Sequence, residues 1–141
     1  MLEVYYRGAS PPTNFYIYLC TSGSTPTEDT NTLSELELAA TGNGYTGPVQ
    51  LTPGATDFDV LTEDDGSDKA YAQIKDIEWI AAGGPIPASG NPIRYVVKTD
   101  DNVTEGSREV LDVWDFGGDI VCPEGSGILL RDLQIDVRKP V

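Results

Sequence analysis

The sequence predicts an all-β domain, arranged as an antiparallel β-sandwich or a jelly-roll-like barrel with one short helix. Short runs rich in Val, Ile and aromatic residues alternate apolar and polar side chains with a period of two, which is typical of half-buried strands. Turn-forming residues, 15 Gly and 10 Pro, are spread between these runs. Because 141 residues suit a single domain, we expect residues 1–141 to share one core.

The candidate strands follow one another along the chain as short runs of β-branched and aromatic residues. In order they are Leu2–Arg7, Phe15–Thr21, Tyr71–Lys75 continued by Ile77–Ala81, Ile93–Lys98, Glu109–Phe116 and Ile128–Lys139. The apolar phase slips by one residue at Lys75-Asp76, and again between Leu130 and Leu133. A residue inserted into one strand, a β-bulge, produces such a slip, so we expect irregular pairing at both places.

One segment, Thr30–Ala40, favours a helix instead. Thr32 followed three residues later by Glu35 is the pattern of a capping box. Leu33, Leu36 and Ala40 would face the core, and Gly42 would end the helix. We therefore expect a helix of one or two turns that depends on tertiary packing.

The composition argues against most classes of enzyme. The chain has no histidine, which excludes Ser-His-Asp and Cys-His nucleophile systems and histidine-containing zinc sites. No catalytic, cofactor-binding or metal-binding residue is predicted, and we expect neither a cofactor nor an enzyme. A small hydrolase built on two carboxylates stays open as a remote alternative, because such pairs converge only in three dimensions.

The charge and the two cysteines limit the partners and the compartment. With 9 Lys+Arg against 23 Asp+Glu, the net charge of -14 repels phosphate backbones and anionic lipid, so neither nucleic acid nor membrane is an expected partner. No secretory signal or membrane-spanning run is visible, so we expect synthesis in a cytoplasm. Cys20 and Cys122 form no redox or zinc motif and are expected to be small buried side chains; whether they pair stays open.

Three polar motifs have simple structural explanations. Gly42–Gly47 matches a dinucleotide-binding pattern, but the helix precedes it and an extended run follows, so we interpret it as a glycine turn. The acidic runs Glu63–Asp68 and Asp100–Asn102 carry oxygen ligands without the spacing of an EF-hand. We expect solvated loops there, with a hairpin tip at Asp65-Gly66, and leave open whether an acidic loop binds calcium.

An aromatic strand, a Pro- and Thr-rich loop with a Leu-containing turn, and a Gly-x-Gly-Tyr motif follow one another early in the chain. They are Phe15–Ser22, Pro26–Leu36 and Gly42–Tyr45, and further motifs of the same series occur at Thr56–Asp65, Ile74–Trp79 and Arg94–Asp101. The series resembles a family of small virion structural proteins of tailed bacteriophages. The resemblance implies a component of the capsid or of the tail, and it supplies no catalytic residue.

We therefore expect a capsid cement or decoration protein that binds over capsomer junctions and is located in the virion. Its partners would be the major capsid protein and further copies of itself, with a trimer suggested by the three-fold axes of capsids. Strand addition at an open sheet edge, with Leu2–Arg7 as the added strand, would supply part of the contact. The alternative is a tail-associated or receptor-binding tip whose aromatic residues stack on host glycans. The candidate interface residues are Leu2, Val4, Tyr5, Tyr6, Tyr45, Trp79 and Trp114. For Trp79, whose phase places it on the inward side of its strand, and for Trp114, the first expectation is a core or sheet-face anchor, with an interface or sugar-stacking role as the alternative.

Overall fold

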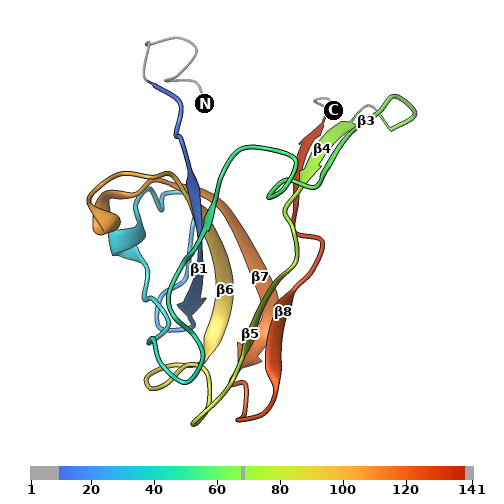
Figure 1. Cartoon of the computed structure of the whole chain (residues 1–141). Coiled ribbons are helices and arrows are strands. Elements are labelled where there is room, and N and C mark those ends of the chain that lie inside the picture. The colour runs from blue at the N-terminus through green and yellow to red at the C-terminus, as the bar shows by residue number, and fades with distance from the viewer. Residues whose placement is uncertain (1–9, 68, 139–141) are drawn as a thin grey trace.

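A computed structural model describes residues 10–67 and 69–138, and this part of the chain consists of strands in antiparallel sheets (Figure 1). The all-β prediction is confirmed. The strands are β1 Phe15–Thr21, β2 Val49–Leu51, β3 Val60–Asp64, β4 Lys69–Gln73, β5 Ile77–Ile80, β6 Ile93–Thr99, β7 Val110–Ile120, β8 Gly127–Leu130 and β9 Gln134–Arg138. Two short 3-10 turns, η1 Leu33–Glu35 and η2 Glu105–Ser107, complete the elements. No helix among the described residues has the length and hydrophobicity needed to cross a bilayer.

One layer of the structure is a four-stranded sheet in the order β2-β1-β6-β7. Strand β1 has the bounds that its alternation of apolar and polar residues predicts. Its register with β6 sets Ile17 opposite Lys98 and Leu19 opposite Val96, so these four side chains share one face of the sheet. Strand β7 is the last strand of the sheet, so its outer edge forms one rim of the layer.

The other layer is a long two-stranded ribbon that bends in the middle. On one side β4 is followed by β5, and on the other β8 is followed by β9; β5 pairs with β8, β4 pairs with β9, and β3 joins β4 as a hairpin. Both sides break at the same level, between Gln73 and Ile77 and between Leu130 and Gln134. These are the places where the apolar phase slips, so the sequence located the breaks correctly. The predicted β-bulge is wrong, because Gln73 pairs with Gln134 and Ile77 with Leu130, which leaves three residues on each side and none inserted. Across the break, the Ile74 N–H donates to the Leu133 carbonyl at 2.9 Å.

The main hydrophobic core lies between the sheet and the ribbon. Alternate residues of the ribbon, Ile77 and Trp79 on β5 and Ile128 and Leu130 on β8, are at most 5% exposed and belong to one cluster with residues of β1 and β6. The opposite face of the sheet is covered by a second cluster. Its buried members are Tyr18, Cys20, Leu33, Leu36 and Val97.

The helix predicted for Thr30–Ala40 is wrong. Only the single 3-10 turn η1 forms, although the Glu35 carboxylate accepts the Thr32 N–H at 2.8 Å as a capping box requires. After the turn the chain extends and pairs with the edge of β1: the Thr21 N–H donates to Glu37 O at 2.8 Å, and the Ala39 N–H donates to Leu19 O at 2.9 Å. The hydrogen-bonding needs of β1 therefore override the local helix propensity of this segment.

The glycine motif at residues 42–47 forms a tight turn, as interpreted from the sequence. Gly42 and Tyr45 exchange backbone hydrogen bonds of 2.8 and 2.9 Å around Asn43 and Gly44, which both have positive φ. A Cβ on Gly44 would lie 2.0 Å from the Ile80 carbonyl oxygen, so only glycine fits against the edge of β5.

The turn directs the Tyr45 ring into the core, where it is 2% exposed. Its ring meets the Trp79 ring edge-on, with centroids 5.5 Å apart, and its hydroxyl accepts the backbone N–H of Leu19 at 3.2 Å. Burial raises the pKa of the Tyr45 phenol to about 12, so the hydroxyl stays protonated at neutral pH.

Replacing Tyr45 with phenylalanine tests this contact. Tyr45→Phe keeps the ring but leaves the buried Leu19 N–H without an acceptor, so we expect the free energy of unfolding to fall by about 1–3 kcal/mol. Urea unfolding followed by tryptophan fluorescence measures the change. The control is Tyr16→Phe, whose hydroxyl makes a longer contact of 3.4 Å to Gln50 at the surface and should cost well under 1 kcal/mol. Equal losses in the two variants would contradict the role of Tyr45.

Candidate interaction surface

A groove opens between the edge of the sheet and the ribbon, where β7 and β8 lie beside each other (Figure 1). Its volume is about 350 Å³. It is lined by Val96, Trp114, Asp115, Phe116, Leu129, Leu130, Arg131 and Leu133. Apolar side chains form most of this lining, and the two charged ones, Asp115 and Arg131, are exposed at its rim. An apolar groove with a few polar groups at its rim is suited to bind apolar side chains of a partner.

The edge of β7 beside the groove has no strand partner in the described part of the chain. β7 is 11 residues long and pairs with β6 alone; its first N–H, at Val110, donates to Asn31 O at 2.9 Å. Its side chains alternate strictly: Trp114 and Phe116 face the core and the groove, whereas Leu111 and Val113, on the opposite side, are 39% and 40% exposed. A long edge strand with exposed apolar residues is a ready site for strand addition and for protein contact.

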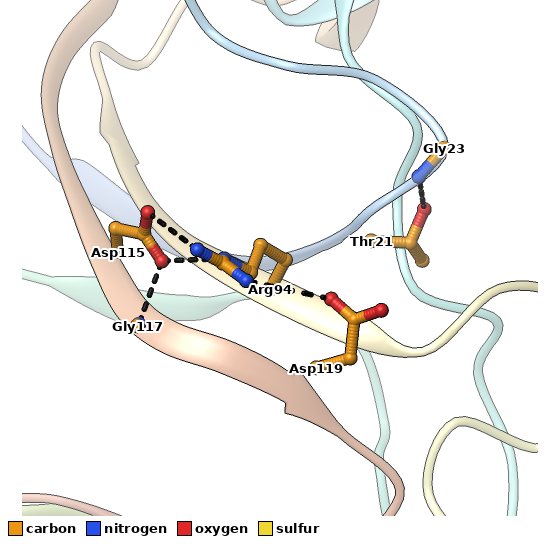
Figure 2. Close-up of polar contacts among 6 residues, drawn as sticks. All are labelled: Thr21, Gly23, Arg94, Asp115, Gly117 and Asp119. Carbon is orange, nitrogen blue, oxygen red and sulfur yellow. Dashed lines mark hydrogen bonds and ion pairs between the residues drawn. The ribbon is translucent and has the colours of Figure 1, made fainter.

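A wide bulge shapes β7 at one end of the groove. Ile93 pairs with Ile120 but Tyr95 pairs with Asp115, so the single residue Arg94 lies opposite four residues of β7. Gly117, inside the bulge, has a φ of 79°, which favours glycine. The bulge turns the carboxylates of Asp115 and Asp119 toward Arg94 (Figure 2).

Arg94 fixes the bulge through its guanidinium group. Its Nε and Nη2 donate to the two oxygens of Asp115 at 2.6 and 3.2 Å, and Asp119 Oδ1 lies 3.8 Å from Nη1. The Gly117 N–H donates to the same Asp115 carboxylate at 2.7 Å (Figure 2). The hydrogen bond from Arg94, followed by that from Gly117, lowers the pKa of Asp115 below its usual range. Asp115 is thus a charged, fully engaged residue at the groove, which is poorly suited to act as a general acid.

The structure separates the predicted interface residues into three groups. Trp114 lines the groove, and its Nε1 donates to the Gln134 carbonyl at 3.3 Å. Tyr45 and Trp79 are 2% and 5% exposed and belong to the core between the two layers, so the prediction of either as a surface contact is wrong, whereas the expectation of Trp79 as a core anchor is confirmed. The remaining predicted residues, Leu2, Val4, Tyr5 and Tyr6, lie outside the described residues, as does the predicted strand Leu2–Arg7.

The sequence does not predict the groove. It places Leu129, Leu130, Leu133 and Asp115 in strands, but the order of the strands in the sheets decides which of them meet at an open edge. The Gly117-Gly118 pair directly after Phe116 is the one local signal of the irregularity in β7.

The two cysteines are buried free thiols. Burial raises the pKa of the Cys20 thiol to about 12, which leaves it protonated and unreactive at neutral pH. Cys122 is 4% exposed in the main cluster. Both therefore act as small apolar side chains, as expected from their sequence context.

The carboxylates of the acidic loop at Asp100–Asn102 accept backbone N–H groups from neighbouring segments of the chain. Asp101 Oδ2 accepts the N–H groups of Thr13 and Asn14 at 3.0 and 3.1 Å, and Asp100 Oδ1 accepts the Glu109 N–H at 2.9 Å. Within residues 10–67 and 69–138 no group of three or more acidic or cysteine side chains is placed to hold a metal ion. Comparisons of the chain with protein-family models, with curated proteins and with solved structures found no match.

The ion pair at the bulge gives a pH-dependent prediction. Because the pKa of Asp115 is lowered in the folded state, its stabilising effect is present above the unfolded pKa of about 4 and is lost as the pH falls through the lower folded value. Asp115→Asn should therefore lower the free energy of unfolding at pH 7, and the difference from wild type should shrink toward pH 3. Urea unfolding across this range measures it. Asp119→Asn, at the longer contact of 3.8 Å, is the control and should show a smaller difference from wild type. A difference between wild type and Asp115→Asn that stayed constant with pH would contradict the assignment.

Proposed function

We propose that this protein is a bacteriophage virion structural protein, and specifically a capsid cement or decoration protein that binds over capsomer junctions. The observation that carries the proposal is the open edge of β7, an 11-residue strand with exposed Leu111 and Val113 on one side and an apolar groove on the other. Such an edge offers both backbone hydrogen bonds and apolar area to a neighbouring protein. The resemblance of the sequence to small virion proteins of tailed phages is the reason why we propose a shell protein as that neighbour.

We also propose that the fold is a β-sandwich. The supporting observation is that one cluster of buried side chains joins the four-stranded sheet to the β5–β8 pair across a shared core. Sheets of four, three and two strands are a simpler match to a sandwich with a bent second layer than to a jelly roll of two equal sheets.

The charge of the chain fits assembly in many copies. A net charge of -14 on 141 residues keeps free copies apart in solution before they bind a particle. Association then depends on local patches where the charge is neutralised, and on β7 the acid Asp112 is already paired with Lys98 at 2.6 Å, as Asp115 is with Arg94. An interface of standard size buries about 800 Å² on each partner, which the outer face and rim of one sheet can supply.

A binding role without turnover is the simpler interpretation of the groove. Its two charged rim residues each face an opposite charge: Asp115 faces Arg94, and Arg131 lies 3.7 Å from Asp76. The proposed location is accordingly the virion, after synthesis in the host cytoplasm, and the proposed partners are the major capsid protein and further copies of this chain.

Binding to purified phage particles tests the function. We expect the wild-type protein to co-sediment with purified capsid shells and not with purified tails. Val113→Asp places a charge on the exposed face of β7 and should weaken shell binding at least tenfold, because an unpaired carboxylate would be buried in the contact. Val103→Asp makes the same change at a side chain that is 98% exposed in a loop, and should bind as wild type.

The outcomes separate the candidate functions. Binding to tails but not to shells would replace the cement function with a tail-associated one. Binding to neither, combined with binding to host glycans, would favour a receptor-binding tip. Equal shell binding by both aspartate variants would remove β7 as the contact surface.

A further inference from the structure

The shell contact tested above uses the exposed face of β7 that carries Leu111 and Val113, and this leaves the groove and the backbone edge of β7 to a second partner. We propose that this partner is the amino-terminal segment of a second copy of this chain, residues 2–7, added as a strand along β7 and placing Leu2, Val4 and Tyr6 against the groove. The inference extends the proposed function, since a cement protein acts as an oligomer, but its test needs no virion component.

The sequence of the segment matches the shape and chemistry of the site. In an extended strand Leu2, Val4 and Tyr6 lie on one face, and Glu3, Tyr5 and Arg7 lie on the other. One face is thus apolar throughout and the other is mostly polar. The groove presents the complementary surface, an apolar lining that includes Trp114, Phe116 and Leu133, directly beside the edge of β7 that no strand of residues 10–67 and 69–138 pairs with. Strand addition satisfies the edge backbone, and alternate side chains fill the groove.

The charge distribution favours this segment over the rest of the chain. Residues 1–14 contain one acid, Glu3, and one base, Arg7, so the net charge of -14 lies entirely on residues 15–141. Two copies therefore repel one another except through a segment of this kind. The acids of β7 near the groove need no further base, because Asp112 and Asp115 are paired with Lys98 and Arg94 within the sheet. A neutral, apolar strand is the partner that this edge accepts.

The first described residues, 10–14, lead away from the sheet (Figure 1). Asp101 holds the N–H groups of Thr13 and Asn14 and fixes the point at which the chain enters β1. Before that point Pro11-Pro12 restricts the backbone to an extended form, and Figure 1 shows the chain continuing past the start of β1, away from the sheet. Nine residues precede Ser10, enough to span about 30 Å when extended and so to reach a neighbouring molecule.

This exchange of strands determines the symmetry of the assembly. Each copy donates one segment and accepts another at a different surface. Reciprocal exchange would give a two-fold dimer, whereas exchange in one direction is heterologous and closes into a ring when the rotation permits. A ring of three would match the three-fold sites of a capsid. Its mass would be about 46 kDa, three times the 15.2 kDa of one chain.

The oligomeric state of the full-length chain tests the inference. Sedimentation equilibrium should give the trimer mass for wild type, and Val4→Asp or Leu129→Asp should weaken association at least tenfold by placing a charge in the groove contact. Two matched controls carry the same added charge elsewhere. Tyr5→Asp lies on the outward face of the same segment, and Val103→Asp lies in an exposed loop; both should remain associated.

A cross-link identifies the donor and the acceptor. Val4→Cys protein mixed with Leu129→Cys protein should form a disulfide-linked pair of about 30 kDa, twice one chain, whereas Val4→Cys mixed with Val103→Cys should not. The native Cys20 and Cys122 are buried and should not interfere.

Three results would overturn the inference: a monomeric wild type, association that survives both Val4→Asp and Leu129→Asp, or cross-linking that does not depend on position. Shell binding by a wild type that is monomeric would reject this inference and leave the proposed function standing. A wild-type trimer that binds no shell would support this inference and reject the proposed function.

Discussion

The hydrogen-bonding needs of strand β1 determine how the surrounding segments are placed. One edge of β1 pairs with β6 along nearly its whole length, whereas β2 pairs with the other edge only from Phe15 to Ile17. The extended chain after η1 takes over where Leu19 accepts the Ala39 N–H. Between these two partners the buried Leu19 N–H has no backbone acceptor, and it donates to the Tyr45 hydroxyl instead. Because an unpaired buried amide costs about 1–3 kcal/mol, three separate stretches of chain are held around one strand.

The open edge is the counterpart of this well-satisfied centre. In the described part of the chain the sheet stops at β7, and the strand carries features that natural proteins use to limit indiscriminate edge pairing: aspartates along its length and a bulge at Gly117-Gly118. These features are local, however. The acids Asp112 and Asp115 are paired with Lys98 and Arg94, and Val113 stays exposed between a second register shift at Leu111 and the bulge at Gly117-Gly118. Irregularities on both sides limit edge pairing to a short stretch of the strand.

The sequence predicted the long strands well because their period-two patterns reflect burial on one or both faces, as for β1 and β6. Shorter elements gave no such pattern: β2 has three residues, and β3 runs into acids before its turn. The helix prediction failed because capping and helix propensity are local properties, whereas the backbone of Glu37 and Ala39 forms hydrogen bonds with β1, which is distant in sequence. The groove could not be predicted at all, since it depends on which strands end each sheet. Trp79 shows the opposite case, because its inward phase already indicated the core position that its interface prediction overlooked.

The paired breaks in the ribbon link two stretches of sequence that lie far apart. Each strand carries its irregularity at the same level, one at residues 74–76 and the other at residues 131–133, so the side chains beyond the bend keep their proper faces on both sides. Loss of a single residue from either stretch alone would turn every later side chain of that strand to the opposite face. A length change in one stretch therefore keeps the side chains on their faces only if the other stretch changes by the same number of residues.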